Sequence, residues 1–162
     1  MTAAQMAQLL ERYACLRGLP EPLSLQLAAI GLLRLGKGSV LFDEGAACSG
    51  FPLVMAGEVR VVKASAGGRA LYLYSVLAGQ SCVITQACLL GKHLYNARGV
   101  AHTDLSLCLM PQSLFDSLLA THEPFRRFVF ALFAERFTDL MALIEAVAFK
   151  RLDQRLAQLL VD

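Results

Sequence analysis

Between residues 32 and 109 the sequence repeats one pattern, in which short runs rich in β-branched and aromatic residues are separated by glycines. The successive runs are SVLF, FPLVMAG, EVRVVKASAGG, RALYLYSVLAG, RGVAHTD and LSLCLMP. Runs of this kind, bounded by turn residues, are typical of β-strands. Several strands in succession, at a spacing of roughly 8–12 residues, predict a β-sandwich or β-barrel.

Helical patterns lie on both sides of this β-region. Apolar residues recur every three or four positions over residues 3–16, which predicts an amphipathic helix ending near Gly18. A second short helix is expected over residues 22–30. After the strands we expect a long helix that begins near Thr121, with Thr121 as its N-cap and Pro124 in its first turn.

The long helix carries an apolar seam at steps of three and four residues. Its members are Phe130, Phe133, Phe137, Leu140, Ile144 and Val147. This heptad spacing is typical of helices that pair, so we expect a homodimer through this helix. A second stripe, formed by Val129, Leu132 and Leu143, lies about a quarter turn away and is expected to cover the chain's own domain. The alternative is a helix that is fully buried in a monomer.

Composition limits the classes of partner. With 162 residues, 56% of them hydrophobic and 17% charged, the chain is expected to fold with a sizeable core. A net charge of +2 is too balanced for a dedicated nucleic-acid surface. The N-terminus has no signal-peptide pattern and no apolar run reaches the length of a membrane span, which favours the cytoplasm. There the five scattered cysteines are expected to be thiols.

Several phrases, in their order along the chain, resemble the sensor half of the Crp/Fnr family of bacterial transcription regulators. LPEPLSLQLA resembles the opening helix pair of that family, and GKGSVLFDEG resembles its strand and turn ending in glutamate-glycine. LVMAGEVRVVK resembles its hairpin, and VAFKRLDQRLAQLL resembles the end of the dimerisation helix with the bridge that follows it. The resemblance covers nearly all of the chain.

The resemblance implies a mainly β fold with flanking helices: a double-stranded β-helix, or jelly roll, of the cyclic-nucleotide-binding type. It divides the chain into a helical lead-in and β-roll sensor (1–120), a dimerisation helix (121–149) and the start of a bridge (150–162). Family members continue into a helix-turn-helix domain that this sequence does not contain. The implied function is effector sensing and dimerisation in a transcription regulator, with DNA bound only through the absent domain.

In family members that bind a cyclic nucleotide, the stretch matching residues 79–101 is a phosphate-binding cassette. A glutamate takes the ribose hydroxyl, and an arginine beside a small residue pairs with the phosphate. Here Gly79 and a helix-like run are kept, whereas Gln80 stands at the glutamate position and Tyr95 at the arginine position. Arg98 lies three residues further on and, by strand alternation, faces the other side. A buried phosphate without a charged partner is costly, so an ordinary cyclic nucleotide is not expected.

The resemblance places the candidate ligand site at Gly79, Gln80, Ser81, Cys82, Val83, Tyr95, Asn96, Ala97, Leu140 and Met141. Nucleotide-binding members usually carry hydroxyl residues at the positions of Leu140 and Met141, and both are apolar here. Such a pocket suits a small apolar or aromatic ligand, or is filled by its own side chains. We also expect residues 82–90 to pack near Leu140 and Met141.

Other readings have less support from the sequence. A stand-alone cyclic-nucleotide-binding module remains an alternative. A lone Cys15 at the N-terminus does not match the cysteine group of an iron-sulfur cluster, and haem ligation by Cys82 or a histidine is a minor possibility. His93, His102 and His122 are expected to be solvated loop residues. A β-roll can also be a cupin-type metalloenzyme, which needs several histidines and a carboxylate, and here only His102 near Asp104 resembles such a set. No catalytic or metal-binding motif is present, so we expect no enzyme, name no metal ligand and leave cofactor, effector and regulated genes unknown.

Overall fold

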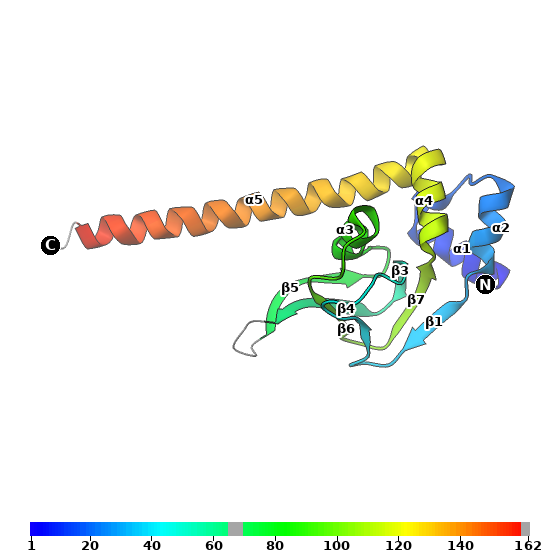
Figure 1. Cartoon of the computed structure of the whole chain (residues 1–162), viewed down its shortest axis with the longest axis horizontal. Coiled ribbons are helices and arrows are strands. Elements are labelled where there is room, and N and C mark those ends of the chain that lie inside the picture. The colour runs from blue at the N-terminus through cyan, green and yellow to red at the C-terminus, as the bar shows by residue number, and fades with distance from the viewer. Residues whose placement is uncertain (65–69, 160–162) are drawn as a thin grey trace. The chain divides into compact units, whose positions relative to one another are not determined.

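The structure of the protein is a computed structural model that describes residues 1–64 and 70–159, with side chains up to residue 146. It contains two compact units, Met1–Phe128 and Val129–Asp162. The first unit holds all the strands and Figure 1 shows its elements in chain order. No helix of the described residues is long and apolar enough to cross a membrane.

The helices that lead into the strands follow the expected pattern, with small shifts at their ends. They are α1 (Ala3–Arg12), the 3-10 turn η1 (Ala14–Leu16) and α2 (Glu21–Ala29). α1 begins with a capping box, in which the side chains of Thr2 and Gln5 each accept a hydrogen bond from the other's backbone N–H. The predicted helix over residues 3–16 is therefore split near Tyr13, which leaves the α-helical conformation.

Seven strands within the described residues form the predicted β-fold. They are β1 (Leu32–Leu35), β2 (Val40–Phe42), β3 (Phe51–Ala56), β4 (Glu58–Ala64), β5 (Ala70–Leu77), β6 (Arg98–Ala101) and β7 (Leu105–Met110). One sheet has the order β1-β7-β3 and the other has the order β2-β6-β4-β5, and all pairings are antiparallel. The mainly β, jelly-roll class expected from the sequence is confirmed.

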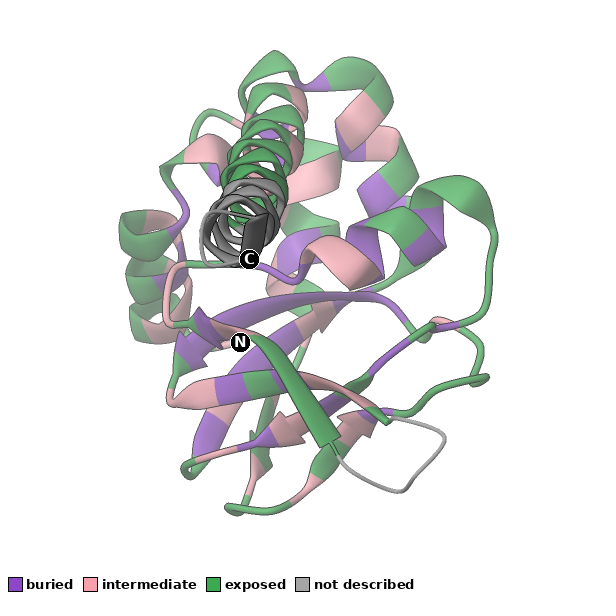
Figure 2. Ribbon diagram, turned by 90° about the vertical axis from the view of Figure 1, so that its left-hand side faces the viewer, coloured by how far each residue is buried: buried purple, intermediate pink, exposed green. Residues whose placement is uncertain are grey.

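Alternation along the strands builds the core between the sheets. In β4, for example, Val59 and Val61 are buried whereas Arg60 between them is exposed. β3 is buried along almost its whole length. Three aromatic rings, those of Phe51, Phe115 and Phe125, pack against one another with centroids 5.0–5.8 Å apart. In Figure 2 buried residues gather on the strands and shorter helices.

The segment after β7 differs from the sequence prediction. A helix that the sequence pattern did not predict, α4 (Gln112–Thr121), follows Pro111, and α5 (Glu123–Leu159) begins two residues after it ends. Thr121 does not cap α5. It is the last residue of α4, and its hydroxyl donates back to the carbonyl of Ser117 at 2.7 Å. The helical backbone of α5 continues past residue 149 to Leu159, within the segment that resembles the bridge.

The turn between β3 and β4 requires glycine at position 57. Gly57 has a φ of +91°, and a Cβ built on it would lie 2.3 Å from the carbonyl oxygen of Asp104. Gly38 has a similar φ of +87°, but nothing lies within 4 Å of the equivalent Cβ. The two glycines thus share the backbone constraint and differ in the space available.

We predict that Gly38→Ala lowers the free energy of unfolding by about 1 kcal/mol, the cost of a left-handed alanine. Gly57→Ala should lose at least ~2 kcal/mol more, because its methyl group collides with backbone that cannot move alone. Urea denaturation of both variants, followed by circular dichroism, measures the difference. Equal midpoints for the two variants would contradict this assignment of the turn.

Candidate functional site

The segment that resembles a phosphate-binding cassette folds as a tight turn followed by a helix. Gly79, with a φ of +82°, makes the turn, and its N–H donates to the carbonyl of Val54 at 3.0 Å. The helix α3 (Val83–Gly91) follows and ends at Lys92, which adopts the left-handed conformation with a φ of 51°. The predicted helical run is therefore present, and a loop then leads to β6.

The first residues of the segment bond to the protein itself. The side-chain oxygen of Gln80 accepts from the N–H of Leu77 at 3.0 Å, and its carbonyl accepts from the Tyr13 hydroxyl at 2.6 Å. The buried hydroxyl of Ser81 donates to the carbonyl of Pro52 at 2.8 Å. In this arrangement both side chains hold the loop on the β-roll.

The N-terminus of α3 also has a partner within the chain. The N–H of Ile84 donates to the Tyr74 hydroxyl at 3.2 Å, and the Sγ atom of Cys82 lies 3.5 Å from the same oxygen. Val83, beside them, is half-buried. Free amides at a helix start are what makes such a terminus attract a phosphate. Here a tyrosine hydroxyl takes one of these amides.

Tyr95 occupies the interior of the roll. Its ring stacks on Phe42, with centroids 4.3 Å apart and planes 13° from parallel. Its hydroxyl lies 3.2 Å from the Sγ atom of Cys48 and donates to Thr85 Oγ1 at 3.4 Å, which connects the strand region to α3. Burial raises the pKa of Tyr95, so the phenol is neutral at physiological pH. The side chain supplies a ring and a hydroxyl, and no charge.

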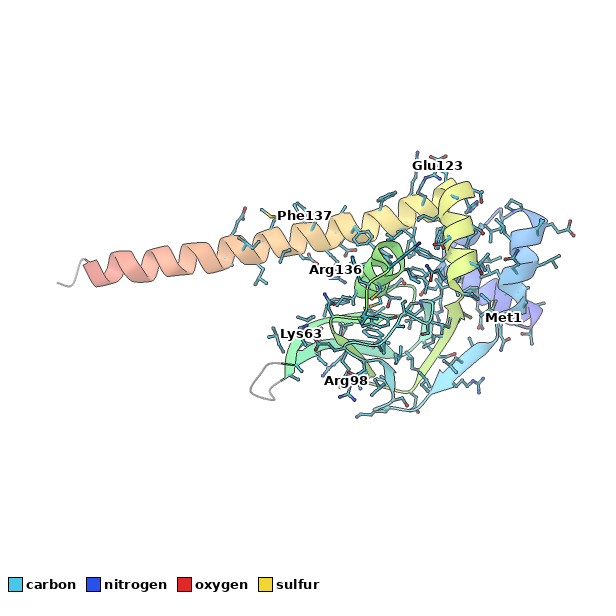
Figure 3. The ribbon with its side chains drawn as sticks, in the orientation of Figure 1. Met1, Lys63, Arg98, Glu123, Arg136 and Phe137 are labelled. Atoms are coloured by element: carbon cyan, nitrogen blue, oxygen red, sulfur yellow. The ribbon has the colours of Figure 1, made fainter. Side chains whose placement is uncertain are left out.

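The residues after Tyr95 turn towards the surface. Asn96 is exposed and its carbonyl accepts from Lys63, whereas Ala97 is buried. Arg98 is exposed on β6 and pairs with Asp43 at 3.6 Å. Figure 3 shows Lys63 and Arg98 on the β-roll, and Lys63 also pairs with Glu44. Both cations therefore have carboxylate partners already.

Leu140 and Met141 belong to the second unit, on α5. Their side chains are 52% and 42% exposed. The first unit contains the other eight residues of the predicted ligand site, and within it the structure groups Cys82, Tyr95 and Ala97 in one core cluster. The expected packing of residues 82–90 near Leu140 and Met141 stays a prediction.

The cysteines and histidines form no metal site in the described part of the chain. All five cysteines are free thiols, and no group of three His, Cys, Asp or Glu side chains is placed to hold a metal ion. Burial raises the pKa of Cys88 and Cys108, which favours the unreactive thiol. The prediction that His122 is a solvated loop residue is wrong. The side chain is buried, and its Nε2 atom lies 3.0 Å from the carbonyl of Cys15.

Four residues of this site were not identified from the sequence: Phe42, Cys48, Tyr74 and Thr85. Phe42 and Tyr74 lie in runs that read as ordinary strands, and their alternation was the one signal of an inward side chain. Cys48 lies in a loop between β2 and β3, where no sequence pattern marks a position that reaches the interior. These four residues contribute aromatic rings, a thiol and hydroxyl groups to the site around Tyr95 and the start of α3.

A family model for the cyclic nucleotide-binding domain matches residues 32–122, which is more than half of the chain. The match covers β1 through α4 and therefore includes the whole cassette segment. Comparison with curated proteins found no match.

Solved structures share the fold at 20–22% identity. A Crp/Fnr-family transcriptional regulator from Eubacterium rectale superimposes with a TM-score of 0.72 at 22% identity, over 83% of this chain and 63% of that one. The catabolite activator protein of Thermus thermophilus gives 0.69 at 21%, over 83% and 63%. The sensor domain of the regulator DNR from Pseudomonas aeruginosa gives 0.61 at 20%, over 87% and 90%.

The chain thus spans less than two thirds of the first two relatives and nine tenths of an isolated sensor domain. At these identities the likeness concerns the fold, which is the one that Crp/Fnr regulators have in this region. The turn at Gly79, the helix after it and the two antiparallel sheets agree with the family match. The chain belongs to the cyclic nucleotide-binding domain family.

Proposed function

We propose that this chain is the effector-sensing and dimerising part of a Crp/Fnr-type transcription regulator, and that its effector is not an ordinary cyclic nucleotide. The family and the fold are those of regulatory domains. DNA would be bound by a separate domain, because a net charge of +2 is too balanced for a dedicated nucleic-acid surface. Five free thiols are in keeping with work in the reducing cytoplasm.

The observation that carries the second half of the proposal is the environment of Tyr95. A cyclic phosphate needs a cation or free amides to replace its hydration. At the position that resembles the phosphate arginine, the structure has a neutral, buried ring stacked on Phe42. The nearby amide of Ile84 is bonded to Tyr74, and Arg98 is exposed beside Asp43. A bound phosphate would have to break these contacts without a charged partner in return.

Cyclic AMP and cyclic GMP are therefore predicted to bind with dissociation constants weaker than about 100 micromolar, or not at all. Isothermal titration calorimetry on the purified chain measures this, with a cyclic-AMP-binding domain of the same family as positive control. A constant in the low micromolar range would refute the proposed exclusion of nucleotides. It would show that Arg98 or a neighbour replaces the missing cation. The second candidate is a stand-alone cyclic-nucleotide-binding module, which the family match supports. The full open reading frame separates the two, because the first requires a helix-turn-helix segment after Asp162.

Dimerisation is proposed from the apolar seam of α5. Four of its six residues, Phe130, Phe137, Leu140 and Ile144, have more than half of their side-chain surface exposed in the single chain. Phe133 is half-buried, and Val147 lies outside the residues whose side chains are described. Phe137 projects from the helix surface in Figure 3. Parallel pairing with a second copy would bury the seam against its own twin, as an isologous contact provides.

We predict that Phe137→Glu converts a dimer into a monomer, because it places two carboxylates opposite each other in an apolar seam. The matched control is Ala142→Glu, which adds the same charge to α5 at an exposed position away from the seam. Light scattering at tens of micromolar measures the molar mass. A parent chain that is monomeric, or a Phe137→Glu variant that stays dimeric, would contradict the assignment of the seam.

A further inference from the structure

A cavity of about 150 Å³ lies in the β-roll, lined by one residue of the cassette segment, Tyr95, and by none of its helix. Its walls come from β1, β2 and β7, chiefly Leu35, Leu41, Leu107 and Leu109, with the rings of Phe42 and Tyr95. None of its lining residues is charged, and none belongs to residues 79–91. The cavity is thus uncharged and mainly apolar, with Ser49 and Gly50 also in its lining.

Size and lining together define what such a space holds. A dry cavity of roughly 150 Å³ lined by leucine and phenylalanine takes up benzene or xenon in an engineered lysozyme, and the general rule is that apolar cavities exclude water. Ordered water needs several polar partners, and the leucine side chains that form much of this lining offer none. A nucleotide, a sugar or a carboxylic acid would leave polar groups unpaired against these walls.

The rim offers an apolar path from the surface. Leu33 on β1 and Val40 on β2 both line the cavity, and both are more than two fifths exposed. Ser49, also at the cavity and exposed, is a hydroxyl-bearing residue at the edge. The part of the lining that reaches the surface thus carries two apolar side chains and one hydroxyl, and no charge.

We propose that this cavity binds a small uncharged molecule, aromatic or aliphatic, of about the size of benzene. Tyr95 connects the cavity to the cassette, because its ring lines the cavity and its hydroxyl donates to Thr85 on α3. A ligand that pushes the ring therefore also strains the contact to α3. The proposal therefore has two steps. The first, binding of the molecule in the cavity, does not depend on the proposed function. The second, in which the bound molecule acts as the effector, rests on it.

The test uses benzene as the probe and the isotope-labelled whole chain. Heteronuclear NMR during a benzene titration should show saturable shifts at the cavity residues, with a dissociation constant of about 1 mM or tighter. Leu35→Phe, which fills the cavity with its own ring, should weaken binding at least tenfold. Leu25→Phe is the matched control, because Leu25 lies on α2, is exposed and does not line the cavity.

Should Leu35→Phe fail to fold, Val40→Phe at the exposed rim serves instead. Unsaturable shifts, or binding that both filling variants retain, would overturn the binding step. The amide signals of Thr85 and its α3 neighbours are expected to shift with the same constant. Shifts confined to the cavity lining would overturn the effector step while leaving the binding step intact. Neither NMR result depends on the oligomeric state. The light-scattering measurement of dimerisation tests the proposed function separately.

Discussion

The stacking of Tyr95 on Phe42 is the contact on which the interior of the β-roll depends. The two rings lie 4.3 Å apart and close the space where the strands and the cassette segment meet. Offset stacking and ring burial favour this pair over solvent exposure. The hydroxyl is then fixed between Cys48 and Thr85, so the same side chain also holds α3. One side chain thus contacts both the strand region and α3.

This arrangement changes what the cassette can recognise. The family architecture offers a helix start and a loop that suit an anion. In this chain the Tyr74 hydroxyl accepts from an amide at the start of α3, and the Tyr13 hydroxyl holds the loop by donating to the carbonyl of Gln80. The cavity between β1, β2 and β7 is uncharged and mainly apolar. The proposal of an uncharged effector follows from this division between satisfied polar groups and an apolar space.

Much of the fold was predictable, because glycine-separated runs with alternating burial leave few arrangements open to strands of this length. The region after β7 was not, since α4 and α5 are separated by His122 alone, and Thr121 resembles an N-cap although its hydroxyl bonds back to Ser117. The role of Gln80 could not be predicted either, because Tyr13, whose hydroxyl donates to the Gln80 carbonyl, lies 67 residues away in the sequence. Sequence reasoning identified Tyr95 but could not find the stacking partner Phe42, which looks like any strand residue.

A double-mutant cycle between Tyr95 and Thr85 tests most directly whether one side chain couples the roll interior to the cassette helix. Tyr95→Phe and Thr85→Val each remove one hydroxyl, and the unfolding free energies of both single variants, the double variant and the parent give the coupling. The account predicts a coupling of about 1 kcal/mol, the net worth of one buried hydrogen bond. A coupling indistinguishable from zero would contradict it.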